Sequence, residues 1–289
     1  MLTQIRPITQ PQRTALPRPF LKWAGGKSQL LQQYQPFLPQ KIRHYYEPFL
    51  GGGALFFSLQ PQASFLMDVN LELINLYRCV QSNVTELIAH LSHHQEQHSE
   101  AYYYDMRSRI QDPTVWFNGG NNVERASRLV YLNKTCFNGL YRENSKGHFN
   151  VPLGRYKNPC ICDRELLEAA SAALANTQIE AQSFEVILEH DTSRRDFVYF
   201  DPPYHPISQT SKFTSYNRDS FTPEDQVRLR DTFVSLSDRG VKVMLSNSDC
   251  EFIRDLYQGF NIYEVSASRH INSKGGKRGK ITELMITSY

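Results

Sequence analysis

The sequence has no disulfide framework, no long apolar run and no internal repeat, and each absence excludes a class of protein. It contains five cysteines, an odd number without framework spacing, so we expect reduced thiols in a cytoplasm. No stretch approaches the ~20 apolar residues of a membrane-spanning helix. The first part of the chain is rich in Pro and Gln and has no apolar core of a secretory signal. Residues 1–19 are therefore predicted to be a flexible lead-in.

Strong charge and the common metal and nucleotide motifs are also missing. The formal net charge is only +3, which permits nucleic-acid binding without arguing for it. Cys160 and Cys162 are one residue apart, which does not match zinc-site spacing, so we expect no metal. Gly26-Lys27-Ser28 would need a glycine where Leu21 stands to form a phosphate loop. The absence of G-x-G-x-x-G disfavours a dinucleotide cofactor.

Short apolar runs alternate with helical segments in two parts of the chain, which predicts an α/β fold with a mostly parallel sheet. We expect one catalytic domain from residues 20–80 and 166–289, interrupted by an insert over 81–165 that is rich in Tyr, Asn, His and Arg. Thr222-Pro223-Glu224-Asp225 is a typical helix start, and Gly240 a typical stop. The expected strands are 42–46, 64–67, 181–184, 197–200, 241–245, 260–267 and 281–287, and the expected helices are 54–59, 71–80, 84–95 and 123–132.

A glycine-rich turn follows the first expected strand. Glu47-Pro48-Phe49-Leu50-Gly51-Gly52-Gly53 allows a ligand close to the backbone, and Asp68 ends the next strand 21 positions after Glu47. An acid in that place can accept hydrogen bonds from ribose hydroxyls. A plain turn with a helix-capping Asp explains the glycines equally well.

Asp201-Pro202-Pro203-Tyr204 is the sharpest signal, because it directly follows the buried strand 197–200. Two prolines stiffen the bend and remove backbone donors, which leaves the Asp201 carboxylate and the carbonyls as free acceptors. Asp201 and the Pro202 carbonyl could accept both N–H groups of an exocyclic amino group and stabilise its developing charge. Tyr204 could stack on the base. The alternative is a proline-stiffened loop without chemistry.

With Phe20-Leu21-Lys22-Trp23-Ala24-Gly25-Gly26-Lys27, these segments make the chain resemble the Dam family, the D12 class of DNA adenine-N6 methyltransferases. The resemblance runs from Phe20 to the C-terminus. It implies a Rossmann-like S-adenosylmethionine-dependent methyltransferase sheet with a helical and hairpin DNA-recognition insert. The implied reaction is methyl transfer to N6 of a flipped-out adenine in duplex DNA, in a prokaryotic cytoplasm beside the nucleoid. The implied cofactor contacts are Trp23, Lys27, Phe49, Gly51, Gly53, Asp68 and Asp201, and the implied catalytic residues are Asp201, Pro202, Pro203 and Tyr204.

The insert carries parts that suit DNA recognition. Residues 132–142 contain an aromatic wedge, an amide, a glycine and an arginine, and arginine is the usual reader of guanine. The segment resembles the family's recognition hairpin, continued over 149–156, and this implies GATC as the target. Phe137 stands where several members carry Tyr, which keeps the stacking. The implied DNA contacts are Lys22, Lys134, Phe137, Asn138, Leu140, Arg142, Pro152, Arg155 and Tyr156. From composition alone, an ordinary solvated loop is at least as good a reading.

Other assignments stay open. The basic loop 272–280 could contact phosphate or be a hairpin tip, and Asn247 could contact cofactor or base. Related tetrapeptides also serve planar amino groups in RNA or in protein amides, so those substrates are the second hypothesis. A DNA-binding regulator without catalysis is the third. The sequence leaves open whether a cognate restriction nuclease accompanies the enzyme, and it implies no oligomer.

Overall fold

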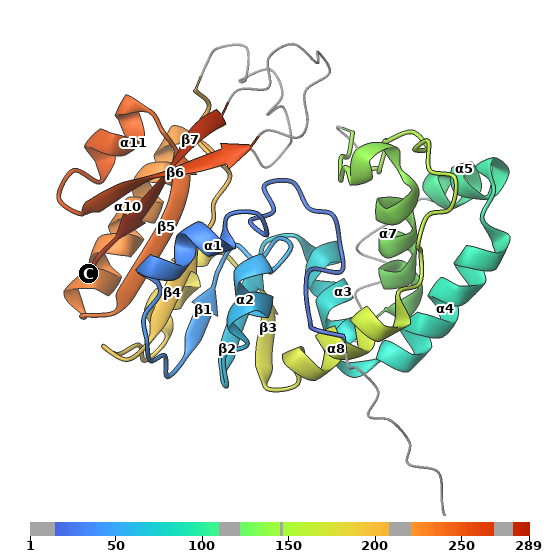
Figure 1. The fold of residues 1–289 in the computed structure, drawn as a ribbon, viewed down its shortest axis with the longest axis horizontal. Helices are drawn as coiled ribbons and strands as arrows, with labels where there is room; N and C mark the ends of the chain where they lie inside the picture. Colours follow the sequence, from blue (N-terminus) through green and yellow to red (C-terminus); the bar gives the residue numbers. More distant parts are fainter. Residues whose placement is uncertain (1–14, 110–121, 145–146, 208–220, 269–279) are drawn as a thin grey trace, which may run out of the picture.

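The computed structural model describes residues 15–109, 122–144, 147–207, 221–268 and 280–289. Most of the expected lead-in and of the basic loop 272–280 therefore lie outside the described residues. Figure 1 shows one twisted sheet with helices on both faces and a group of helices beyond one edge.

The sheet has seven strands in the order β3-β2-β1-β4-β5-β7-β6. Strands β1 to β5 run parallel, and β7 pairs antiparallel with both β5 and β6. The expectation of a mostly parallel α/β sheet is confirmed. The strands are β1 (Tyr45–Glu47), β2 (Ser64–Asp68), β3 (Thr177–Ala181), β4 (Phe197–Phe200), β5 (Lys242–Ser248), β6 (Asn261–Ser268) and β7 (Lys280–Thr287).

The strand order reverses between β1 and β4. The chain runs from β1 through β2 to β3 at one edge, then returns to β4 beside β1 and continues to β5 on the other side. Tyr46 pairs with Val198, so the carboxyl ends of these two strands are neighbours. Such a reversal point is where open α/β sheets bind ligands, because the helices that follow the two strands diverge there.

Alternating side chains of the strands build two cores, one on each face. In β4, Phe197 and Tyr199 belong to one core, and Val198 and Phe200 belong to the other. This is why β4 reads as a continuous apolar run. The core with Phe197 is covered by α1 (Leu31–Tyr34), α2 (Ala54–Leu59), α3 (Leu71–Ser82) and α8 (Arg164–Leu174), and the other by η3 (Phe184–Glu189), α10 (Pro223–Asp238) and α11 (Glu251–Leu256).

The helix after Thr222 begins as expected. The Thr222 hydroxyl accepts from the Asp225 N–H, and the Asp225 carboxylate accepts from the Thr222 N–H. These two bonds satisfy amide groups that have no partner inside the helix. Gly240 has φ +76°, which suits glycine at the helix end.

One predicted strand is wrong, and another begins late. The strand expected at 181–184 is Thr177–Ala181 instead, and Phe184 begins a 3₁₀ helix in the core. The alternation that identifies β3 lies earlier, since Thr177 and Ile179 are buried and Gln178 is exposed. The strand expected at 42–46 is limited to Tyr45–Glu47.

Three helices of the middle part lie beyond β3 (Figure 1), two of them packed on α3 and the third packed on one of those two. They are α4 (Val84–Gln97), α5 (Glu100–Ser108) and α7 (Val123–Thr135), and they extend the Phe197 core without a break. The helices expected at 84–95 and 123–132 are confirmed, and α5 was not predicted. A mostly irregular stretch follows α7 and contains the short η2 (Phe137–Gly139).

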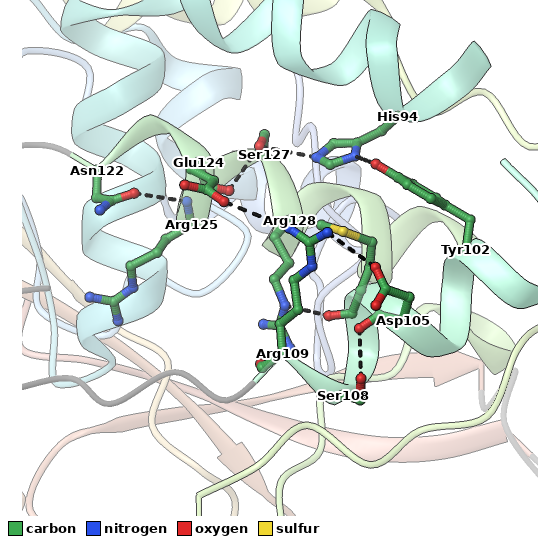
Figure 2. A network of polar contacts seen from close by, with 11 residues as sticks. His94, Tyr102, Asp105, Ser108, Arg109, Asn122, Glu124, Arg125, Ser127 and Arg128 are labelled. Carbon is green, nitrogen blue, oxygen red and sulfur yellow. Dashed lines mark hydrogen bonds and ion pairs between the residues drawn. The ribbon is translucent and has the colours of Figure 1, made fainter. Parts of the chain in front are cut away.

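A buried polar network joins these helices (Figure 2). The His94 Nδ1 lies 2.8 Å from the Tyr102 hydroxyl, and Nε2 lies 3.2 Å from Ser127 Oγ. Ser127 donates its only hydroxyl proton to the Glu124 carbonyl, so His94 Nε2 must be the donor to Ser127 and Nδ1 the acceptor from Tyr102. The bond that Nδ1 accepts needs neutral imidazole, and burial lowers the pKa of His94 to about 4.

Candidate active site

The glycine turn after β1 adopts backbone conformations that suit glycine. Gly51 and Gly53 have φ +47° and +63°. The Asp68 carboxylate at the end of β2 accepts from the Gly51 N–H at 3.1 Å and the Asn70 N–H at 2.9 Å. Asp68 therefore fixes the turn, and each of its oxygens has a further lone pair to offer a ligand. Burial raises the pKa of Asp68 above its usual range.

Trp23 covers this turn. A Cβ on Gly51 would lie 3.0 Å from Trp23 Cδ1, and one on Gly53 would lie 2.9 Å from the Tyr77 hydroxyl. The Trp23 ring stacks on Tyr141, with ring centroids 5.2 Å apart. Neither Tyr77 nor Tyr141 was singled out from the sequence, because nothing in their spacing connects them to the turn.

Phe49 joins a group of aromatic rings at the same end of the sheet. Its ring lies 5.3 Å from Phe184, 5.6 Å from Phe221 and 6.2 Å from Phe200, between centroids. These rings come from distant parts of the chain, so sequence reasoning missed Phe184 and Phe221. The half-buried Phe49 gives the glycine turn an apolar neighbour.

Asp201 lies directly after β4 and is held by two side chains. Its Oδ1 is 2.7 Å from Lys27 Nζ and accepts a hydrogen bond of 2.7 Å from Ser246 Oγ. Lys27 is buried and also donates to the Gly25 carbonyl at 2.6 Å. The carboxylate was expected to be free, and this is wrong for one oxygen. No described residue donates to Oδ2, so that oxygen is available to a substrate.

The backbone of the tetrapeptide is held by an amide relay. Gln226 Nε2 donates to the Pro203 carbonyl at 2.9 Å, and Asn247 Nδ2 donates to Gln226 Oε1 at 2.9 Å. The Asn247 oxygen in turn accepts from the His205 N–H at 3.1 Å. The Pro203 carbonyl is therefore not the free acceptor that the sequence suggested. Within the described part of the chain, no hydrogen bond reaches the Pro202 carbonyl.

Tyr204 is oriented at both of its ends. Its hydroxyl donates to Glu283 Oε2 on β7 at 2.8 Å, and Lys27 Nζ lies 4.7 Å from its ring centroid. Burial raises the pKa of Tyr204 well above its usual value, so the phenol remains a neutral donor. Glu283 was not predicted, because a lone acid in a strand carries no motif.

Glu47 is a buried carboxyl at the end of β1. It accepts a hydrogen bond from the Tyr45 hydroxyl at 2.9 Å. Burial raises the pKa of Glu47 to about 8, and the negative charge of Asp201 adds to the effect. The group therefore carries a proton over much of the neutral range.

The expected DNA contacts lie on and around a hairpin-like segment. The Phe137 N–H donates to the Pro152 carbonyl at 2.8 Å, and the Asn150 N–H donates to the Arg142 carbonyl at 3.1 Å. Phe137 is 47% exposed in the short turn η2, where Asn138 has φ +57°. Arg142 is exposed and donates from Nε to the Asn150 side chain at 2.7 Å.

Not all expected contacts are equally exposed. Lys22 Nζ lies 3.2 Å from the Tyr156 hydroxyl, and Arg155 and Pro152 are exposed nearby in sequence. Lys134 is half-buried, and this burial lowers its pKa. Leu140 is also half-buried and packs against the core.

A cavity of about 230 Å³ lies beside the hairpin-like segment and is lined in part by arginines. Arg128 donates to the carbonyls of Met106, Arg107 and Arg109, which closes the end of α5. This clustering of cationic groups was not predicted, because the arginines come from two helices. Among the described residues, no group of three or more His, Cys, Asp or Glu side chains could hold a metal ion, and no helix is long and apolar enough to cross a membrane.

Comparison with known families identifies the class of protein. The profile of the D12 class of N6 adenine-specific DNA methyltransferases matches residues 23–271. The chain belongs to this family and is an adenine-specific DNA methyltransferase.

Three similar proteins cover nearly the whole chain. Type II methyltransferase M1.LlaDCHI of Lactococcus lactis subsp. cremoris is 50% identical over 274 residues, 94% of this chain and 95% of its own. Type II methyltransferase M.MjaIII of Methanocaldococcus jannaschii is 43% identical over 94% of this chain and 99% of its own. The DNA adenine methylase of Escherichia coli K12 is 37% identical over 93% of this chain and 94% of its own.

Proposed function

We propose that the protein transfers a methyl group from S-adenosylmethionine to N6 of an adenine flipped out of duplex DNA, within GATC. The observation that carries this proposal is the position of Asp201 and Tyr204. They lie at the carboxyl end of β4, next to the glycine turn that follows β1. A donor in the turn and a base at the tetrapeptide would therefore be neighbours.

The residues around the turn fit the methyl donor. Gly51 and Gly53 lack side chains where a ligand must approach the backbone, and Asp68 offers acceptors for hydroxyl groups. Two aromatic faces come from Trp23 and Phe49, and a positive charge comes from Lys27. Asp201, the remaining implied cofactor contact, supplies a carboxylate beside Lys27. Bound S-adenosylmethionine supplies a methyl group on a positively charged sulfur, which is already activated for transfer and calls for no metal.

The tetrapeptide then acts on the amino group of the base. Its lone pair is delocalised into the ring, so it is a weak nucleophile. Asp201 Oδ2 and the Pro202 carbonyl are acceptors for its two N–H groups, which favours the more nucleophilic geometry and stabilises developing positive charge. Pro203 is anchored by Gln226, and Tyr204 presents its ring to the base.

The helical group and the hairpin-like segment support a DNA-recognition insert over 81–165. An adenine within the helix hides N6 in the stack, so the base must leave the duplex. The exposed Phe137 can fill the space left behind, and Asn138 and Arg142 can contact base edges. GATC itself rests on the resemblance of this segment to the family's recognition hairpin.

The proposed function is tested by identifying the product of the reaction. Duplex DNA incubated with the protein and S-adenosylmethionine should contain N6-methyladenine after digestion and mass spectrometry, and Asp201→Ala should yield none while keeping its fold. Methylation of RNA or of a protein amide without methylation of duplex DNA would favour the second hypothesis. Failure to bind the donor in calorimetry would favour a regulator without catalysis.

We also propose a partner and a cellular location for the protein. The type II methyltransferases of Lactococcus and Methanocaldococcus support a restriction nuclease as partner. Relatives in these organisms and in Escherichia coli support a place in a prokaryotic cytoplasm beside the nucleoid.

A further inference from the structure

Asn133 lies near the end of α7 and is 1% exposed. Its Oδ1 accepts from the Lys22 N–H at 2.9 Å. Its Nδ2 donates to the Lys22 carbonyl at 2.7 Å and to the Gly139 carbonyl at 3.1 Å. Both amide N–H groups and the amide oxygen are therefore used, all of them on backbone atoms of two other segments.

Those two segments reach the two expected sites, and the Lys22 side chain is itself an expected DNA contact. Lys22 precedes Trp23, whose ring covers Gly51 in the glycine turn. Gly139 ends the short turn that presents Phe137. The segments also touch directly, because a Cβ on Gly139 would lie 2.4 Å from Lys22 Cδ. One buried amide thus connects the cofactor side of the molecule to the DNA side.

We propose that Asn133 is a positioning residue that couples occupancy of the cofactor site to the placement of the DNA-contacting turn. The inference rests on the proposed function. Moving Lys22 relative to Gly139 would leave buried polar groups without partners, which costs free energy. A ligand that fixes Trp23 therefore also fixes the turn, and DNA that fixes the turn strengthens binding of the cofactor to the same degree.

The chain offers a matched control in Asn75. Its Nδ2 donates to the Asn122 carbonyl at 2.9 Å, and its Oδ1 accepts from the Asn122 N–H at 2.8 Å. It is 7% exposed and joins α3 to the start of α7. The same substitution at Asn75 removes a similar bridge without touching Lys22 or Gly139.

The experiment measures the Kd of S-adenosylhomocysteine with and without a GATC duplex, by calorimetry, so that no turnover occurs. We expect the duplex to tighten binding to the wild-type protein by about 5- to 150-fold, the usual range of such couplings. Asn133→Asp lacks both donors, and the ratio should fall towards one. Asn75→Asp should keep the wild-type ratio. A wild-type ratio in Asn133→Asp, or an equal loss in Asn75→Asp, overturns the proposal.

A second variant serves if Asn133→Asp does not fold. Gly139→Ala leaves Asn133 intact but forces Lys22 away, and its φ of +64° adds backbone strain. It should also lower the ratio, and an unchanged ratio overturns the inference. If the wild-type protein methylates duplex DNA but shows no coupling, this inference fails and the proposed function stands. If it neither methylates duplex DNA nor binds S-adenosylhomocysteine, the proposed function fails, and the inference with it.

Discussion

At the scale of single residues, the proposed chemistry depends on how the two oxygens of Asp201 are used. Lys27 and Ser246 occupy Oδ1, and this fixes the plane of the carboxylate. Oδ2 is left for the substrate in an orientation set before the substrate arrives. Preorganisation of this kind avoids a reorganisation cost during the reaction.

Replacing Asp201 by Asn tests that arrangement. The amide keeps the shape but loses the charge that faces Lys27 and the amino group of the base. We expect methyl transfer to fall by at least about 100-fold, and the thermal unfolding midpoint to fall as well, because the buried Lys27 loses its counter-charge. Asp231→Asn is a control, because Asp231 is exposed and pairs only with Arg230 among the described residues. Equal activities of the two variants would remove Asp201 from the catalytic role.

Tyr204 should contribute mainly through its ring. Tyr204→Phe loses the bond to Glu283 but keeps a surface for stacking, so we expect a rate loss of about tenfold or less. Tyr204→Ala should lose much more, because no surface remains for the base. Single-turnover methylation rates compare the two variants. Equal losses would show that the hydroxyl, not the ring, is what matters.

Gly53→Ala should destabilise the protein. The residue has φ +63°, and a Cβ would lie 2.9 Å from the Tyr77 hydroxyl. We expect a loss of about 1–3 kcal/mol in the free energy of unfolding, measured in urea. Gly259→Ala is the control, since a Cβ there meets no atom within 4 Å and φ is not positive. A neutral Gly53→Ala would contradict the close approach at the turn.

At the scale of helices and strands, the elements predicted correctly are those whose bounds depend on neighbouring residues in the sequence. Helix 54–59 and strand 197–200 have the expected bounds, and the helix after Thr222 has the expected cap. The strand predicted at 181–184 is wrong, because Ala181-Gln182-Ser183-Phe184 is too short an alternation to show that tertiary contacts draw Phe184 into the core.

The candidate site was likewise predictable only where its residues are adjacent in sequence. Asp201 and the glycine turn were recognisable because their residues are adjacent in sequence. The contacts of Glu283, Gln226 and Ser246 were not recognisable, because they depend on how distant strands and helices meet.

The helical group should be sensitive to acid through His94. Its pKa falls from about 6.5 in the unfolded chain to about 4 in the folded protein, so folding favours the neutral form. The stabilisation is complete above pH 6.5 and is lost as pH falls towards 4. The loss should be on the order of 1–3 kcal/mol.

Urea unfolding of the wild-type protein and of His94→Gln between pH 4 and pH 6.5 tests this titration of His94. The raised pKa of Glu47 acts in the opposite sense, with stability lost as pH rises from about 4.5 towards 8, and it cancels in the comparison. The difference between the two proteins should shrink below pH 6. A constant difference would show that His94 does not titrate as described.

At the scale of the whole molecule, one continuous core runs from the sheet into the helical group. Phe197 in β4, Tyr77 in α3 and Tyr131 in α7 belong to the same cluster. The catalytic part and the proposed recognition part are therefore built as one body. This continuity holds Phe137 and Asp201 in a fixed relation, as the proposed extraction of a single base requires.

The most direct test of the central claim is methyl transfer from labelled S-adenosylmethionine to three duplexes. One contains GATC, the second has its guanine replaced, and the third has its adenine replaced. We expect label only in the first, because in the proposed function the hairpin-like segment reads the guanine and the tetrapeptide acts on the adenine. Label in the second duplex as well would keep the adenine chemistry and remove GATC, and label in the third equal to that in the first would contradict the account.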